Sequence, residues 1–197
     1  MGKAQNVNTR KLVLLALFTG IVVVLQFFGS FIRFGPFAIS LVLMPIVVGA
    51  ALIGVYAGGW LGLAFGFTVL FSPETAFFMS LNAPATVFVI LMRGLLAGLA
   101  AGAVYKAFED KNKTAAAVLA AAVCPIVNTG IFIAGLYAFF LPVIAAWGAE
   151  AGAVNTASYI FLTLIGANFL LEFALNMTLS AIIVRLVQFG RDRSYLK

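Results

Sequence analysis

The chain has 197 residues, of which 64% are hydrophobic and only 9% are charged. A soluble domain carries about 25% charged residues, so this composition excludes an ordinary soluble fold and indicates an integral membrane protein. The net charge of +6 is spread too thinly for a nucleic-acid-binding face, and the lack of histidine removes the usual general base and metal ligand. The single Cys124 excludes an intramolecular disulfide, and we expect no metal site.

Apolar runs of about 20 residues predict membrane-spanning helices. The second and third runs adjoin closely and are separated by a tight turn near 54–59. We expect a loop over 72–84, where Pro73 and Pro84 interrupt the apolar pattern. The sequence therefore predicts a single transmembrane domain, a compact all-α bundle of six helices, at about residues 12–32, 41–55, 56–71, 85–107, 114–141 and 159–187.

The basic residues predict the orientation of these spans. All lysines and arginines except Arg33 and Arg93 lie before the first span, between the fourth and fifth, or at the end of the sixth and beyond. Because Lys and Arg mark the cytoplasmic side, both termini are expected to be cytoplasmic. The loops after spans one, three and five would then face outward.

Small residues recur every four positions in three of the predicted spans. In lipid, such a pattern allows helix backbones to approach closely, either within one chain or between subunits. We interpret the two longer glycine series as packing inside the bundle. The short pair Ala16 and Gly20, near the cytoplasmic end of span one, is the stronger candidate for docking another membrane protein. The glycine series are Gly54, Gly58, Gly62 and Gly66, and Gly94, Gly98 and Gly102.

Two charged residues lie within the predicted spans. Arg93 follows Pro84 by nine residues, which places it roughly 13 Å below the outer end of span four. Glu172 is the one carboxylate deep inside an apolar run. An ionisable group in hydrocarbon is costly and normally faces a partner charge or a water-filled cavity. The two residues therefore form either a structural ion pair or the polar lining of a solute-binding cavity.

Several asparagines accompany these charges. Asn168 and Asn176 flank Glu172 at i−4 and i+4, so on a helix all three share one face. Asn128 follows Pro125, which removes a backbone hydrogen bond and kinks the helix, so that Asn128 either satisfies the kink or forms a ligand cradle. Asn82 lies in the outer loop, where a lid would be.

No catalytic constellation accompanies this polar set. The chain has no HExxH, GxSxG or Walker A motif and no acidic cluster, so we expect a binding protein and not an enzyme. It also has no soluble segment large enough to hydrolyse ATP. Energy for uphill movement of a solute would have to come from a partner or an ion gradient.

The order and spacing of these features resemble the substrate-binding S components of bacterial energy-coupling-factor (ECF) vitamin transporters. The resemblance covers essentially the whole length of the chain. It rests on the size, on six spans with both ends inside, and on three segments: the start from Thr9 to Gly20, the Met44-Pro45-Ile-Val-Val-Gly49-Ala50 segment followed by glycines, and the Asn168…Glu172…Asn176 span.

The resemblance implies a protein of the bacterial cell membrane that captures a vitamin from outside. It implies three partners, a transmembrane coupling (T) subunit and two cytoplasmic ATPases, with ATP used by those partners and no cofactor in this chain. The Ala16 and Gly20 pair, an AxxxG variant of the family's AxxxA motif, would pack against the T subunit. The implied substrate-binding residues are Asn82, Arg93, Asn128, Asn168, Glu172 and Asn176.

The identity of the vitamin stays open. The Cys124-Pro125-x-x-Asn128-Thr129-Gly130 segment is similar to S components assigned to pantothenate, while riboflavin, a pyridoxine-like compound, folate and cobalamin remain alternatives. We interpret the phenylalanines as lipid-facing and core residues. Two other classes of protein also fit the residues: a stand-alone proton-coupled carrier that uses Glu172 and Arg93, and a membrane scaffold whose polar residues only lock helices together.

Overall fold

The computed structural model describes the backbone of residues 2–29, 33–34, 37–38 and 41–194 and, within these, the side chains of 9–29, 41–73, 75–166 and 169–185. Apart from a two-residue antiparallel ladder between β1 and β2, the regular structure described is helical, which confirms the predicted all-α class. The elements are α1 (Gly2–Gly29), β1 (Arg33–Phe34), β2 (Phe37–Ala38), α2 (Leu43–Ile53), α3 (Val55–Val69), α4 (Pro73–Phe108), α5 (Lys113–Phe139), α6 (Leu141–Glu150), α7 (Thr156–Ser158), the π-helix η1 (Tyr159–Leu164) and α8 (Gly166–Ser194).

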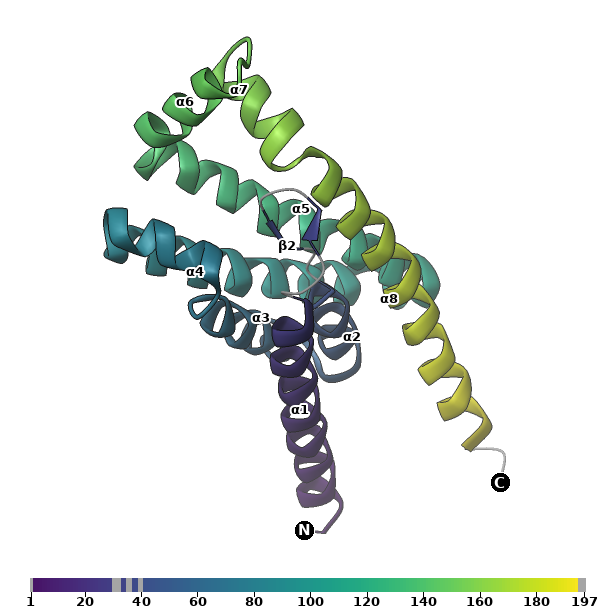
Figure 1. The fold of residues 1–197 in the computed structure, drawn as a ribbon. Coiled ribbons are helices and arrows are strands. Elements are labelled where there is room, and N and C mark those ends of the chain that lie inside the picture. Colours follow the sequence, from purple (N-terminus) through teal and green to yellow (C-terminus); the bar gives the residue numbers. More distant parts are fainter. Residues whose placement is uncertain (1, 30–32, 35–36, 39–40, 195–197) are drawn as a thin grey trace.

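The short helix α2 lies at the centre of the packing. It contacts α1, α3, α4, α5 and α8, and its Ile46 and Val47 are 0% exposed. Around it, α3 packs on α4, α4 on α5, and α5 on α8 (Figure 1). A helix that is apolar on every side, as this one is, must be enclosed by other elements. Because these helices pack around α2, they are held in position relative to one another, and they carry the site.

Glycines form the contact between α3 and α4. A Cβ atom at Gly62 would overlap the backbone carbonyl of Gly94, and a Cβ atom at Gly98 would overlap that of Gly58. The two backbones therefore touch directly, which only glycine allows at these positions. The prediction that the two glycine series pack within the chain is confirmed, except at Gly54, where a Cβ atom would meet nothing within 4 Å.

The turn between α2 and α3 is made at Gly54, whose φ of 134° is accessible to glycine and strained for other residues. This agrees with the predicted division between the second and third apolar runs. In the described part of the chain, three helical segments are long and apolar enough to cross a membrane: Thr9–Gly29, Thr75–Phe108 and Lys113–Phe139. The pair Thr156–Leu164 and Phe169–Arg185, bent by 44°, can form a fourth, while α2 and α3 are shorter apolar helices. The count of six spans stays a prediction.

The prediction of a loop over 72–84 is wrong. Pro73 occupies the first turn of α4, where its missing N–H costs nothing, so it begins a helix. The helix is interrupted only at Asn82, which has non-helical φ and ψ of −155° and 89°. The Oδ1 atom of Asn82 accepts a hydrogen bond from the Ala85 N–H at 3.1 Å and so caps the following segment. The N-terminal end of α4 is thus a helical arm, and a second helix, α6, occupies part of the expected loop after span five.

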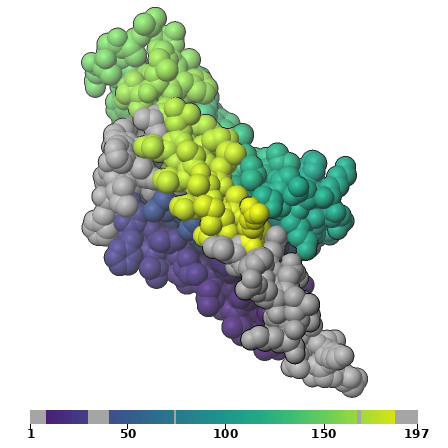
Figure 2. All heavy atoms as spheres, turned by 90° about the vertical axis from the view of Figure 1, so that its right-hand side faces the viewer, coloured from purple at the N-terminus to yellow at the C-terminus, as the bar shows by residue number. Residues whose placement is uncertain are grey.

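The ends of the helices lie in two groups. In Figure 1, α1 begins and α8 ends on the same lower side of the molecule, and α6 and α7 lie at the opposite side. Figure 2 shows α8 running along one face from the α6–α7 end, with α1 on one side of it and the α4–α5 end on the other. Which of the two ends faces the cytoplasm stays a prediction from the basic residues.

Candidate functional site

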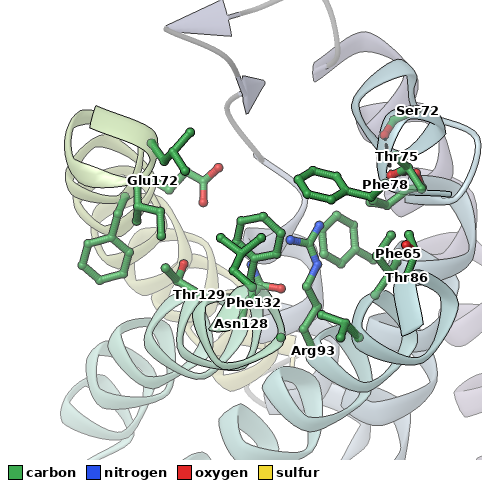
Figure 3. A pocket seen from close by; sticks show the side chains of 18 of the residues that line it. Phe65, Ser72, Thr75, Phe78, Thr86, Arg93, Asn128, Thr129, Phe132 and Glu172 are labelled. Atoms are coloured by element: carbon green, nitrogen blue, oxygen red, sulfur yellow. Dashed lines mark hydrogen bonds between the residues drawn. The ribbon is translucent and has the colours of Figure 1, made fainter. Parts of the chain in front are cut away.

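A cavity of about 140 Å³ lies among α3, α4, α5 and α8, with the end of α1 and the η1 segment also lining it. Its wall is largely apolar, with a few polar side chains that reach it from α4, α5 and α8 (Figure 3). A mostly apolar cavity with a small number of convergent polar groups is the usual form of a small-molecule site.

Arg93 projects into this cavity from α4. Its guanidinium carbon lies 5.1 Å from the centre of the Phe132 ring and 5.8 Å from that of the Phe65 ring. These distances are within the range of a cation–π interaction. The Nε atom is buried and has no hydrogen-bond partner among the described residues. The ring contacts therefore leave the Nε donor unsatisfied.

Asn128 projects into the cavity from α5. It is only 5% exposed, and its Oδ1 atom is buried without a hydrogen-bond partner. Thr129, the next residue, also lines the cavity. Asn128 lies one turn after Pro125, but α5 continues as one helix through that proline.

Glu172 reaches the cavity from α8. Figure 3 shows its carboxylate and the Arg93 guanidinium on facing walls, with the cavity between them. The structure thus brings together Arg93, Asn128 and Glu172 around one space, as the depth of each residue in the sequence predicted. Their role in binding a solute stays a prediction.

Asn176 lies outside the cavity. Its Nδ2 atom donates a hydrogen bond of 2.6 Å to the carbonyl oxygen of Ala121, and its Oδ1 atom accepts one of 3.1 Å from Ser180. Ala121 is four residues before Pro125, so its carbonyl is the one that the proline leaves without a helical partner. Asn176 therefore joins α8 to α5 at the proline, as expected of an asparagine that bridges two helices and does not bind a ligand.

The other predicted residues are placed differently. Asn82 is exposed and makes the helix cap described above. The side chain of Asn168 lies outside the described residues. Ala16 and Gly20 are exposed on α1, and a Cβ at Gly20 would meet nothing within 4 Å.

Sequence reasoning missed the aromatic wall. Five phenylalanines line the cavity, although we expected this residue type in the core and against lipid. Two of them carried a usable signal: Phe132 is four residues after Asn128, and Phe169 is three residues before Glu172, so each shares a helix face with a polar residue of the site. The five are Phe65, Phe78, Phe132, Phe140 and Phe169.

The cavity ends at the N-terminal arm of α4. Phe78 packs edge-to-face on Phe140, which lies between α5 and α6, with ring centroids 5.1 Å apart, and lies near Trp147 of α6. The hydroxyls of Ser72 and Thr75 lie 3.0 Å apart, and Thr75 donates to the Val69 carbonyl at 2.8 Å. These hydroxyls have partners within the chain, unlike Arg93 Nε and Asn128 Oδ1.

An all-α bundle with long apolar helices and a largely apolar cavity of this kind defines an integral membrane protein that binds a small molecule. The family model for the substrate-specific component of ECF transporters matches residues 10–184. The chain belongs to this family of ECF transporter substrate-specific components, as the sequence resemblance indicated. Comparison with curated proteins and with solved structures gave no match.

Proposed function

We propose that this protein resides in a bacterial cell membrane and captures a vitamin-sized solute from the outer side in the cavity between α4, α5 and α8. It then delivers the solute through a transmembrane T subunit that two cytoplasmic ATPases drive. The observation that carries the proposal is a cavity whose wall holds a buried donor and a buried acceptor, neither with a partner among the described residues. The chain itself contributes binding, and ATP is used by its partners.

The Ala16 and Gly20 pair supports the assembly. Both residues are exposed, and the open space above Gly20 allows another helix backbone to come close. This surface lies on α1, which is peripheral and packs on α2 and α3. The solute cavity and the docking surface are therefore formed by different faces of the protein.

Co-expression with a T subunit and two ATPases tests this function. We expect a stable complex to co-purify with the tagged protein. After reconstitution into vesicles, uptake of the solute should require ATP on the ATPase side and should not respond to an imposed proton gradient. Purification of the tagged protein alone, in repeated attempts, would contradict the proposal.

The same vesicles distinguish the alternative of a stand-alone proton-coupled carrier. Such a carrier would use Glu172 as its proton site and Arg93 as the counter-charge. It would take up solute without partner subunits when a proton gradient is imposed, and Glu172→Gln would abolish that uptake while the protein still folded.

A further inference from the structure

Two buried atoms at the cavity have no hydrogen-bond partner among the described residues, and they require opposite kinds of partner. Arg93 Nε is a hydrogen-bond donor and Asn128 Oδ1 is an acceptor, and both are buried. Nearly all buried polar atoms in proteins have a partner, so a group that lacks one among the described residues is suited to receive a partner from a solute. A solute that fits this cavity therefore carries at least one acceptor for Arg93 and one N–H or O–H group for Asn128.

The setting of Arg93 favours a carboxylate as the acceptor. The guanidinium is planar and pairs with a carboxylate through two parallel hydrogen bonds. Its contacts with the rings of Phe65 and Phe132 leave its Nε–H group available. A charged acceptor in this largely apolar space also offsets the cost of keeping the arginine charged there.

The other charge at the cavity limits the solute to one negative group. Among the described residues that line the cavity, Arg93 and Glu172 are the charged ones. A second negative charge on the solute would face the Glu172 carboxylate without a described cation to offset it. This favours a monocarboxylate over a phosphate or a dicarboxylate.

The volume of the cavity limits the size. A cavity of about 140 Å³ favours a small solute over compounds of the size of folate or cobalamin. The five phenylalanines of the wall favour an apolar or aromatic body.

On the basis of the proposed transport function, we infer that the solute is a small monocarboxylate with an apolar or aromatic body. Its carboxylate accepts hydrogen bonds from Arg93, and an N–H or O–H group of the solute donates to Asn128. The inference specifies a chemical class that family membership alone leaves open.

Matched pairs of compounds test the class on the unchanged protein. The first member of each pair is an acid and the second is a neutral analogue of nearly the same shape. Thermal unfolding and equilibrium binding would be measured for the purified protein, because a compound that binds only the folded state raises the unfolding temperature. The pairs are 4-aminobenzoate and 4-aminobenzamide, indole-3-acetate and indole-3-acetamide, and pantothenate and panthenol.

We expect at least one acid to raise the unfolding temperature and to bind about 10- to 100-fold more tightly than its neutral partner, the loss typical of a missing charge-assisted hydrogen bond. The class is wrong if no acid stabilises the protein, or if the neutral partners bind as tightly as the acids. Because these measurements use the unchanged protein, they do not depend on whether a variant folds.

Two substitutions then test which residue binds each polar group of the acid. Arg93→Gln should abolish the preference for the acid over its neutral partner, and Arg93→Lys should retain part of it because the charge remains. Asn128→Leu should weaken binding of the acid about tenfold and leave its preference over the neutral partner intact. An acid that binds Arg93→Gln and Asn128→Leu as tightly as the unchanged protein would overturn the assignment.

The complex with the T subunit and the ATPases separates this inference from the proposed function. If the complex assembles but only neutral compounds bind, the transport function stands and the monocarboxylate class fails. If no complex assembles while an acid still binds through Arg93, the reverse conclusion follows.

Discussion

A single side chain, Asn176, compensates for a proline in a neighbouring helix. Pro125 cannot donate to the carbonyl of Ala121, and Asn176 Nδ2 donates to that oxygen at 2.6 Å. In the low-dielectric interior of a membrane protein, an unpaired carbonyl is expensive. Asn176 therefore connects α8 to α5 at the one point where α5 lacks its own hydrogen bond.

Replacing Asn176 by leucine should lower the free energy of unfolding by about 1–2 kcal/mol, because the Ala121 carbonyl then stays buried without a donor. In a Pro125→Ala background the same replacement should have a smaller effect, since the new N–H at position 125 can donate to Ala121. Unfolding of the four proteins of this cycle in detergent measures the difference. An equal loss in both backgrounds would show that the hydrogen bond is not what stabilises the pair.

The individual polar residues of the site could be identified from the sequence, but the residues that they contact could not. Arg93, Asn128 and Glu172 stand out in the sequence because polar groups are rare in apolar runs. The bond between Asn176 and Ala121 joins residues 55 positions apart and depends on how α8 is rotated against α5. Among 20 phenylalanines, the ones at the cavity differ from the others only by tertiary placement, so composition could not identify them.

At the scale of helices, the α3–α4 contact rests on backbone against backbone. A methyl group at Gly62 would overlap the carbonyl of Gly94, which belongs to the neighbouring helix and cannot move as a flexible side chain would. Separating the two helices would also shift Phe65 and Arg93, which lie on α3 and α4 and line the cavity. The close approach therefore supports the geometry of the site.

We expect Gly62→Ala to destabilise the protein by about 1–3 kcal/mol, the usual range for overpacking. Gly130→Ala is the matched control, because nothing lies within 4 Å of a Cβ at that position and alanine favours a helix. Thermal unfolding of the two variants should differ in sign, with the control unchanged or slightly more stable. If both variants unfold alike, the glycine contact does not hold the helices together.

The helical elements were predictable from apolar runs and glycine spacing, but the conformation of residues 72–84 was not. Pro73 and Pro84 interrupt the apolar pattern, and a proline is compatible both with a loop and with the first turn of a helix. The structure resolves this because Pro73 follows the extended Ser72 and begins α4, and Asn82 alone leaves the helical conformation. The local sequence therefore could not distinguish a proline in a loop from a proline that begins a helix.

At the scale of the whole molecule, α1 differs from the other long helices. Only 11% of its spanning window is buried within the chain, against 39% for α4 and for α5. Its exposed surface includes Ala16 and Gly20. A peripheral helix with a small-residue pair is suited to exchange lipid for a partner helix without disturbing the bundle.

Gly20→Leu should therefore reduce co-purification of the T subunit and change the free energy of unfolding by no more than about 0.5 kcal/mol, as is usual for an exposed position. Gly130→Leu places the same side chain at another open position, on α5, and should not affect assembly. Loss of the complex with both variants would indicate a general effect of the leucine, and retention with both would place the docking surface elsewhere.

The aromatic contact at the N-terminal arm of α4 also provides an intrinsic fluorescence signal. The chain has two tryptophans. The Trp147 ring lies 5.0 Å from Phe77 and 6.2 Å from Phe78, and Phe78 lines the cavity. The Trp60 indole instead donates a hydrogen bond of 3.2 Å to Thr19 of α1. One fluorophore thus lies beside the cavity and the other beside the helix that carries the docking pair.

With Trp60→Phe, the remaining emission comes from Trp147, and we expect it to change when a stabilising carboxylate is titrated into the protein. With Trp147→Phe, the emission of Trp60 should respond to the T subunit and not to the solute. A solute that alters both signals equally would show that the cavity and α1 move together. The placement of two indoles on separate faces therefore allows capture and handover to be followed as distinct events in one polypeptide without an added label.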